Sequence, residues 1–244
     1  MSSGRLPGTG QGIDGVTAAG LAALDREVIA CRRCVRLVRW REKVARVKVR
    51  RFADQTYWAK PIPGFGDPAA RLLLIGLAPA AHGGNRTGRM FTGDESGNWL
   101  FRALHAAGFA NQAASLQRND GLALTDCYIT ATCRCAPPGN KLLPREVAAC
   151  RPFLLRELAL LTRVRVVVGL GRVGFETALA AYRALERIPY GIKPAFAHGA
   201  RYDFGGITLI ASFHPSQQNT FTGRLTRPML NRVFREARTA LADR

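Results

Sequence analysis

Four of the six cysteines have the spacing of metal ligands. Cys31 and Cys34 form a C-x2-C pair, whereas 14 residues separate Cys135 from Cys150. Four thiolates are common ligands of structural zinc and of iron–sulfur clusters, and spacing alone does not choose between the two. Cys133 lies two residues before Cys135 and is a competing ligand. In a reducing compartment we expect metal ligation or buried thiols rather than a disulfide framework.

A glycine-rich stretch is the second candidate for chemistry. It spans Leu72–Asp94 and has the sequence LLLIGLAPAAHGGNRTGRMFTGD. The apolar run Leu72–Ile75 passes into a loop with five glycines, which is typical of the carboxyl end of a parallel strand. Ligands of open α/β sheets bind at that end. The stretch therefore predicts backbone that lies close to a flat or charged ligand.

Further polar side chains are expected near the same edge. His214 follows the apolar run Ile207–Phe213 and precedes a proline, so a functional role is favoured over that of a strand-end residue. Asn140 ends a Pro-Pro-Gly-Asn turn, where asparagine can also serve conformation alone. Asp94 is a candidate for chemistry and, equally, a candidate N-cap of the helix that follows. Phe91 lies among glycine and polar residues, which is poor context for a core aromatic.

The segment Gly169–Gly174 (GLGRVG) matches the dinucleotide-binding pattern G-x-G-x-x-G. It follows a predicted strand and opens a predicted helix. The acid that should end a second strand about 20 residues later is missing. We therefore interpret the segment as a tight turn with close helix packing, and a nucleotide-dependent oxidoreductase is the weakest of the functions considered.

The chain is strongly basic. Its 244 residues contain 36 Lys or Arg and 17 Asp or Glu, a net charge of +19, which favours a polyanionic partner such as nucleic acid or an anionic membrane. The range Arg32–Arg51 holds ten basic residues and one acid, interleaved with apolar residues. This pattern predicts one face that packs and another that presents charge to phosphates.

The elements that must position these residues alternate between strands and helices. The pattern predicts an α/β fold with a mostly parallel four-stranded sheet between two helical layers. The expected strands are 72–75, 128–131, 164–168 and 207–213. The expected helices are 16–40, with Cys31 and Cys34 inside it or at its end, and 96–107, 144–161, 171–186 and 225–241.

A single domain over 17–244 is expected after a disordered tail at 1–16. The sequence has no signal-peptide pattern and no apolar run long enough to cross a bilayer. We therefore expect a cytoplasmic protein with no membrane partner.

These motifs occur in the same order in a known family. The cysteine pattern, GLAPAAHGGNRTGRMFTGD, the turn that ends at Asn140, and HPSQQNTFTGR from His214 together resemble the uracil-DNA glycosylase superfamily. The chain is most similar to family 5, the type B iron–sulfur enzymes of bacteria and archaea. The resemblance covers roughly Cys31 to Leu241. It implies the αβα uracil-DNA glycosylase fold, a 4Fe-4S cluster rather than zinc, and Cys133 as a bystander. The implied cluster ligands are Cys31, Cys34, Cys135 and Cys150.

The family's first motif carries a departure that supports family 5. Related families place an acid or amide directly after the first glycine of this motif, Gly76, or one residue later. Here these positions are Leu77 and Ala78, whose side chains cannot act on a proton. The residue that activates water therefore stays open at the sequence level.

The resemblance implies a monofunctional DNA glycosylase, the first enzyme of base excision repair. It would hydrolyse the N-glycosidic bond of uracil, hypoxanthine or xanthine flipped out of double-stranded DNA. Phe91 would stack on the base and His214 would stabilise the leaving anion. Asp94 would position water or stabilise the sugar cation, and Asn140 would bind the base or water. The implied base pocket consists of Gly76, Leu77, Ala78, Pro79, Ala80 and Phe91.

The loop after His214 is expected to contact DNA. Its candidate residues are Ser216, Gln217, Gln218, Asn219 and Arg224, and Phe221 is a candidate wedge. The protein is expected to act as a monomer. The alternative function is an iron–sulfur or zinc nucleic-acid-binding module without catalysis, because the usual acid is missing after Gly76.

Overall fold

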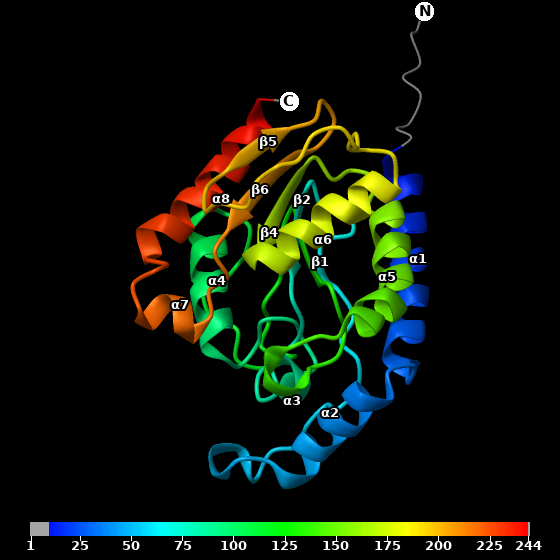
Figure 1. Cartoon of the computed structure of the whole chain (residues 1–244), viewed down its shortest axis with the longest axis vertical. Coiled ribbons are helices and arrows are strands. Elements are labelled where there is room, and N and C mark those ends of the chain that lie inside the picture. Colours follow the sequence, from blue (N-terminus) through cyan, green and yellow to red (C-terminus); the bar gives the residue numbers. More distant parts are fainter. Residues whose placement is uncertain (1–9, 244) are drawn as a thin grey trace, which may run out of the picture.

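A six-stranded mixed sheet forms the centre of the computed structural model, which describes residues 10–243. Its strand order is β1-β3-β2-β4-β6-β5 (Figure 1). The four inner strands are parallel, and the two short edge strands pair antiparallel. The strands are β1 (Phe65–Gly66), β2 (Leu72–Gly76), β3 (Cys127–Ala131), β4 (Val166–Leu170), β5 (Arg201–Asp203) and β6 (Thr208–Ser212).

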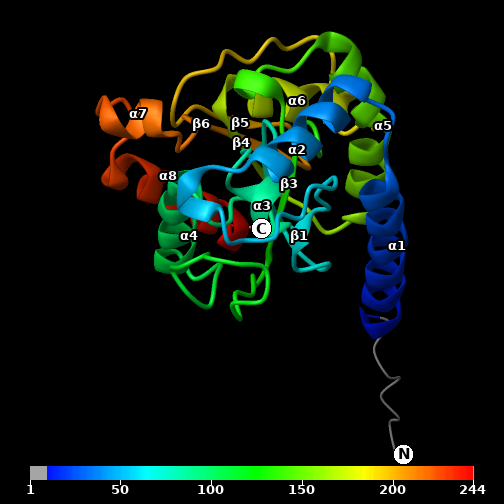
Figure 2. The ribbon, with the colours of Figure 1, turned by 90° about the horizontal axis from the view of Figure 1, so that it is seen from below.

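Two layers of helices cover the sheet, and the predicted αβα fold is confirmed. The longer helices are α1 (Gly10–Ala30), α2 (Val35–Val47), α4 (Glu95–Ala106), α5 (Pro144–Leu160), α6 (Gly171–Ala184) and α8 (Arg227–Ala242). Short helical segments are η1 (Arg50–Phe52), α3 (Gly84–Thr87), η2 (Pro138–Asn140) and α7 (Gln217–Phe221). Seen from below, α4 and α8 lie on one side of the strands and α1 and α5 on the other (Figure 2).

The sheet's two faces bury alternate residues of each strand. Leu72 and Leu74 of β2 pack into the core beneath α4 and α8. Leu73 and Ile75 of the same strand pack into the core beneath α5 and α6. All five residues of β2 are buried. A parallel strand that is covered on both faces needs apolar residues at every position, which explains why the sequence of β2 is continuously apolar rather than alternating.

The glycines of GLGRVG serve packing. A Cβ at Gly169 would collide with the backbone of Phe175, and a Cβ at Gly174 would collide with the carbonyl oxygen of Ile75. Gly171 has a positive φ of 81° at the start of α6. The interpretation as a tight turn with close helix packing is confirmed.

The predicted helix over 16–40 is two helices. Residues 31–34 form a break between α1 and α2, so Cys31 and Cys34 lie in a connection rather than within one helix. α1 packs on α5 through Leu24 and Val28 against Phe153. The predicted tail 1–16 falls partly outside the described residues, and from Gly10 onward it belongs to α1.

No helix within residues 10–243 is long and apolar enough to span a membrane. Residues 216–224 were expected to form a loop, but they contain the short helix α7, with Ser216 as its N-cap. The four inner strands begin and end within two residues of the predicted limits, and the largest shift is that of β4, which begins and ends two residues late.

Candidate active site

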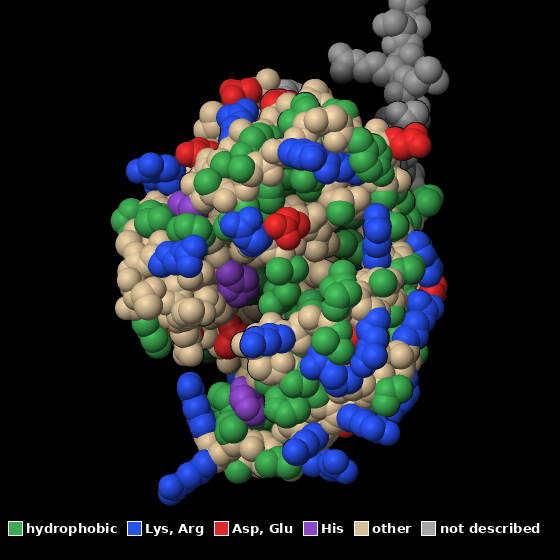
Figure 3. Space-filling model, viewed as in Figure 1, with side chains coloured by type: hydrophobic (Ala, Val, Ile, Leu, Met, Phe, Trp, Pro, Cys, Tyr) green, Lys and Arg blue, Asp and Glu red, His purple; other side chains and the backbone are tan. Residues whose placement is uncertain are grey.

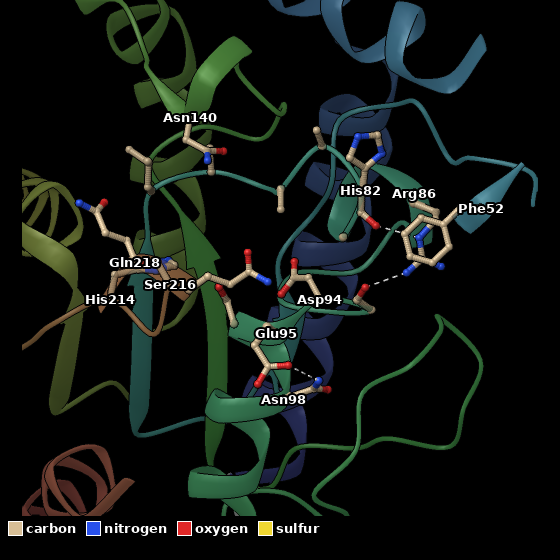
Figure 4. Close-up of a pocket in the computed structure, with 18 of the residues that line it drawn as sticks. Phe52, His82, Arg86, Asp94, Glu95, Asn98, Asn140, His214, Ser216 and Gln218 are labelled. Carbon is tan, nitrogen blue, oxygen red and sulfur yellow. Dashed lines mark hydrogen bonds between the residues drawn. The ribbon is translucent and has the colours of Figure 1, made fainter. Parts of the chain in front are cut away.

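A cleft of about 890 Å³ opens at the carboxyl ends of the parallel strands. The surface is hollowed here, between the part of the molecule that carries α7 and the part that carries α2 (Figure 3). The cleft brings together the three side chains predicted to be catalytic, Asp94, Asn140 and His214. Figure 4 shows Asp94 near the middle, His214 and Gln218 on one side, and His82 and Arg86 on the other.

A smaller recess joins the cleft and contains most of the predicted base pocket. Asp94 and His214 line the recess as well as the cleft. Leu77 lines the cleft but not the recess. The other predicted pocket residues, all of which line the recess, are Gly76, Ala78, Pro79, Ala80 and Phe91.

Phe91 is held in an uncommon backbone conformation at this recess. Its φ of 51° is in the left-handed region, which costs energy for a bulky residue and is concentrated at functional sites. Its ring lies against Gly76, where a Cβ would be 3.0 Å from the Cζ atom. Its carbonyl oxygen lies so close to Gly97 of α4 that a side chain there would collide with it. Two glycines therefore fix where the ring lies.

His214 lies beside Phe91, with ring centroids 5.7 Å apart and an interplanar angle of 31°. Burial lowers the pKa of His214 to about 4, so the imidazole is neutral at physiological pH. Its carbonyl oxygen accepts a hydrogen bond of 2.9 Å from Asn219 Nδ2. At Gly171 a Cβ would lie 3.2 Å from the Cβ of His214. The GLGRVG turn therefore also leaves room for this histidine.

Asp94 caps α4 and faces the cleft at the same time. Its Oδ1 accepts a hydrogen bond of 2.9 Å from the N–H of Gly97, as expected of an N-cap. Its Oδ2 points to Gly83, where any side chain would collide with it. Burial raises the pKa of the Asp94 carboxyl, against the lowering effect of the Gly97 N–H and the Arg86 charge. One oxygen thus serves the helix while the carboxylate remains in the cleft.

Arg86 braces the loop that carries Asp94. Its Nε donates to the carbonyl oxygen of His82 at 2.8 Å, and its Nη2 donates to that of Gly93 at 2.8 Å. Its guanidinium carbon lies 3.9 Å from the ring centroid of Phe52, which belongs to the segment after α2. The sequence analysis missed Arg86, although the dense motif around it was a usable signal.

Asn140 is exposed in η2 and has a positive φ of 56°. It reaches the cleft from the turn after β3, at the top of the view in Figure 4. Asn140 therefore has both a backbone conformation that suits asparagine in a turn and a position in the cleft. Its neighbour Gly139 also has a positive φ, of 59°.

The five residues expected to bind DNA divide into two groups. Ser216, Gln217 and Gln218 line the cleft, at the start of α7. Asn219 instead holds the backbone of His214, and Arg224 stacks on Phe213 at 4.6 Å and does not line the cleft. The cleft also contains Arg51, the last residue of the predicted basic run, and residues that the sequence analysis missed: Phe52, His82, Glu95, Ser96, Asn98 and Leu116.

A separate cavity lies between α2, α5 and the segment after β3. Cys31, Cys34, Cys135 and Cys150 all line it, and so does Cys133. Within residues 10–243, no group of three or more His, Cys, Asp or Glu side chains is arranged to hold a metal ion.

Two buried arginines border this cysteine cavity. Arg41, 2% exposed, donates from Nη1 to Cys135 Sγ at 2.9 Å and from Nη2 to the carbonyl oxygen of Cys31 at 3.3 Å. Arg134 pairs with Glu157, and both are almost fully buried. Arg41 Nε and Arg134 Nε and Nη1 are buried donors without a hydrogen-bond partner among the described residues. Buried N–H donors without a partner among the described residues therefore lie next to the cysteines.

Known proteins are similar to this chain over most of its length. Residues 63–238 match the family model of the uracil DNA glycosylase superfamily. A type-5 uracil-DNA glycosylase of Thermus thermophilus is 52% identical over 221 residues, which cover 88% of this chain and 98% of that protein. The type-5 enzyme of Mycobacterium bovis is 50% identical over 223 residues, 91% of this chain and 82% of that protein. For the type-5 enzyme of Pyrobaculum aerophilum the identity is 44%, over 86% of this chain and 88% of that protein.

Proposed function

This chain belongs to the uracil-DNA glycosylase superfamily, and we propose that it hydrolyses the N-glycosidic bond of uracil, hypoxanthine and xanthine in double-stranded DNA. The observation that carries the proposal is the recess in which Phe91 and His214 lie side by side next to Asp94. A flipped base needs a pocket with one stacking face, polar contacts to its edge and a route for water. The recess and the adjoining cleft supply all three.

Base binding begins at the loop after β2. The ring of Phe91 stacks on the flipped base, and Gly76 keeps that ring at the wall of the recess. Backbone groups of Leu77 and Ala78 read the edge of the base, because their side chains offer no polar atom.

Departure of the base is assisted by His214. A neutral imidazole donates a hydrogen bond to a base carbonyl oxygen, where negative charge develops as the glycosidic bond breaks. The lowered pKa of His214 suits this role, because the ring is neutral at physiological pH yet still carries one N–H group with which to donate. Asn219 fixes the backbone of His214 from α7.

Water is positioned by Asp94. Burial raises the pKa of its carboxyl group, which makes the carboxylate a better proton acceptor than an exposed aspartate. Its negative charge also stabilises the sugar cation that forms as the base leaves. Asn140, across the cleft, binds the base or the water.

The product is an abasic site, because none of the described residues that line the cleft is a lysine. An amine is needed for a Schiff base with the sugar and for a covalent enzyme–DNA intermediate. Treatment with borohydride during turnover should therefore trap no DNA on the protein.

We also propose a 4Fe-4S cluster held by Cys31, Cys34, Cys135 and Cys150. The residues fit this group, because four thiols line one cavity and two buried arginines next to them have unpartnered N–H donors. Such donors stabilise the negative charge of thiolates and sulfides. The cluster would supply structural cross-linking rather than a step of hydrolysis. Cys133 stays outside the proposed ligand set, as the family resemblance implies, although it lines the same cavity and its thiol donates to the carbonyl oxygen of Glu146 at 3.6 Å.

The first experiment is excision by Asp94→Asn under single-turnover conditions. Asparagine preserves the N-cap, so the thermal unfolding curve should stay close to that of the wild type. Excision of uracil should fall by about 100-fold or more, the usual contribution of a general base. Excision at the wild-type rate would refute the role of Asp94.

The substrate range is tested with duplexes that carry uracil, hypoxanthine or xanthine, followed by alkali to cleave abasic sites. Alkali-labile product from all three would support the proposed range. Tight binding of every duplex without any product would instead favour the non-catalytic nucleic-acid-binding module.

A further inference from the structure

The backbone just before His214 is held by a side chain rather than by a neighbouring strand. β6 ends at Ser212, and the N–H group of the next residue, Phe213, donates a hydrogen bond of 3.0 Å to the Nδ1 atom of His198. His214 follows Phe213 directly. The backbone that leads into the proposed catalytic imidazole is therefore fixed by a second histidine.

A tight turn and a β-bulge bring His198 to this place. The N–H of Ala200 donates to the carbonyl oxygen of Ala197 at 3.0 Å, and Gly199 has a positive φ of 79° within this turn. Ala211 of β6 accepts from the N–H of Gly199 at 2.8 Å and donates to the carbonyl oxygen of Ala200 at 2.9 Å, so that two residues oppose one. Such a bulge redirects side chains and is common next to active sites. The bulge therefore explains how a side chain from the segment before β5 reaches the end of β6.

Aromatic packing supports the same contact. The imidazole of His198 stacks on the ring of Phe213, with centroids 5.0 Å apart and an interplanar angle of 28°. Phe196 packs on Phe213 at a centroid distance of 6.1 Å, and the guanidinium carbon of Arg224 lies 4.6 Å from the centroid of the Phe213 ring. Phe213 is therefore held through its ring as well as its backbone, and a displacement of this residue would break both kinds of contact.

The hydrogen bond from Phe213 requires a neutral ring at His198. An Nδ1 atom that accepts a hydrogen bond carries no proton, so the proton of the neutral ring is on Nε2. Burial lowers the pKa of His198, which favours this neutral form at physiological pH. His198 lines neither the cleft nor the recess. It can therefore act on the reaction only through other residues.

The chain is held on both sides of the His214 side chain. Before it, the N–H of Phe213 is bound by His198, and after it, the carbonyl oxygen of His214 accepts a hydrogen bond of 2.9 Å from Asn219 Nδ2. Past the end of β6, two side chains thus continue what the strand ladder begins. An imidazole that must meet a base carbonyl oxygen needs this placement, because an error of about 1 Å can slow a reaction about 100-fold.

We infer that His198 is a positioning residue for His214, because it fixes the backbone from which the imidazole reaches the leaving base. The inference rests on the proposed function and adds to it a residue outside the cleft. It assigns to His198 no contact with DNA or with the reacting atoms. Loss of the bond to Phe213 should therefore slow departure of the base without weakening the binding of DNA.

The test is single-turnover excision of uracil by two variants of His198 whose side chains differ by one methylene group. In His198→Asn the side-chain oxygen takes the place of Nδ1 and can accept from Phe213, whereas in His198→Gln the polar atoms lie where Nε2 was. His198→Gln should excise about 10- to 100-fold more slowly than the wild type, and His198→Asn should recover most of that loss. Both variants should bind a duplex that carries an abasic site as tightly as the wild type.

Tyr202→Phe is the matched control from the same part of the chain. It removes a hydrogen bond of 2.7 Å to the carbonyl oxygen of Ala195 but leaves Phe213 untouched, so it should excise at the wild-type rate. A double-mutant cycle with His214→Ala then shows through which residue His198 acts. At long reaction times, where slow hydrolysis is measurable, His198→Gln should cost less than about twofold in the His214→Ala background.

Several results would overturn the positioning role. They are wild-type excision by His198→Gln, equal losses in His198→Gln and His198→Asn, equal losses in His198→Gln and Tyr202→Phe, and a loss in His198→Gln that multiplies with that of His214→Ala. In each of these cases the wild type still excises uracil, and the proposed function stands. A wild type that releases no uracil would instead overturn the proposed function.

Discussion

Asp94 and His214 share one recess, and burial shifts the pKa of each side chain in the direction that favours the uncharged form. For Asp94 this means a raised pKa, and for His214 a pKa of about 4. The two side chains therefore respond differently to a fall in pH. Protonation at low pH removes the ability of the Asp94 carboxylate to accept a proton, whereas it adds a positive charge to His214.

The rate of excision should fall on the acid side because of Asp94. The wild-type pH–rate profile should show an acid limb above the usual pKa of an aspartate, since burial raises that pKa. His214→Asn should lower the rate at every pH but leave the limb where it is. Loss of the acid limb in His214→Asn would show that the histidine titrates instead.

At the residue scale, motifs predicted more than composition did. Asp94, Asn140 and His214 were placed at one sheet edge from strand ends and a turn, and the structure brings them into one cleft. Leu116 and Arg86 were not predicted. The dense motif around Arg86 was a usable signal, whereas no local pattern marks Leu116 as an exposed residue at the rim of the cleft.

At the element scale, the basic run of α2 divides into internal and free charges. Arg36 binds Glu146 of α5 through two bonds of 2.7 Å, and Arg41 binds Cys135. Arg39 and Lys43 form no hydrogen bond or ion pair among the described residues. They border an open groove of about 440 Å³, whose other lining residues are Val35, Arg36, Trp40, Pro138 and Arg145.

This groove predicts a contact with the DNA backbone. The turn η2 separates it from the active-site cleft, with Pro138 in the groove and Asn140 in the cleft. The double substitution Arg39→Ala/Lys43→Ala should weaken binding of any duplex and reduce the slope of log affinity against log salt by about 2. Binding isotherms at several salt concentrations measure this slope.

The control is Arg232→Ala/Arg235→Ala on α8. It lowers the net charge by the same amount, but at exposed residues outside the cleft and the groove. That variant should keep the wild-type salt slope. Equal losses in both double variants would mean that net charge, rather than the groove, sets the affinity.

Long elements were predictable and short ones were not. The buried strands and amphipathic helices were found because each has a long apolar pattern. β1 and β5 have two and three residues, too few for any period. The break between α1 and α2 was missed because Cys31–Cys34 contains neither glycine nor proline, and tertiary contacts rather than local propensity end the helix there.

At the scale of the whole molecule, the cysteines join parts of the chain that are far apart in sequence. Cys31 and Cys34 lie between α1 and α2, Cys135 follows β3, and Cys150 belongs to α5. The buried pair of Arg134 and Glu157 lies next to this joint, where Thr130 also donates to Glu157. A bound cluster would therefore stabilise the whole arrangement rather than one loop.

Substitution of a proposed ligand should release iron and lower the melting temperature. Cys150→Ser is expected to lose bound iron and sulfide and to melt about 5–10 °C lower, because metal binding contributes to folding. Cys133→Ser, beside it, should keep both. Iron and sulfide analysis of the anaerobically purified proteins, with thermal unfolding, makes the comparison. Iron loss in Cys133→Ser but not in Cys150→Ser would reassign the fourth ligand.

The packing of α1 on α5 limits how the protein can be divided. The family match begins at residue 63, yet Leu24 and Val28 share a core with Phe153, and Glu27 pairs with Arg156. A fragment cut at that boundary would expose the apolar side of α5 and lose two of the four candidate ligands. The region shared across the superfamily is thus not a physically separable unit here, and a transplant of the catalytic part into another protein would have to include the helices that precede it.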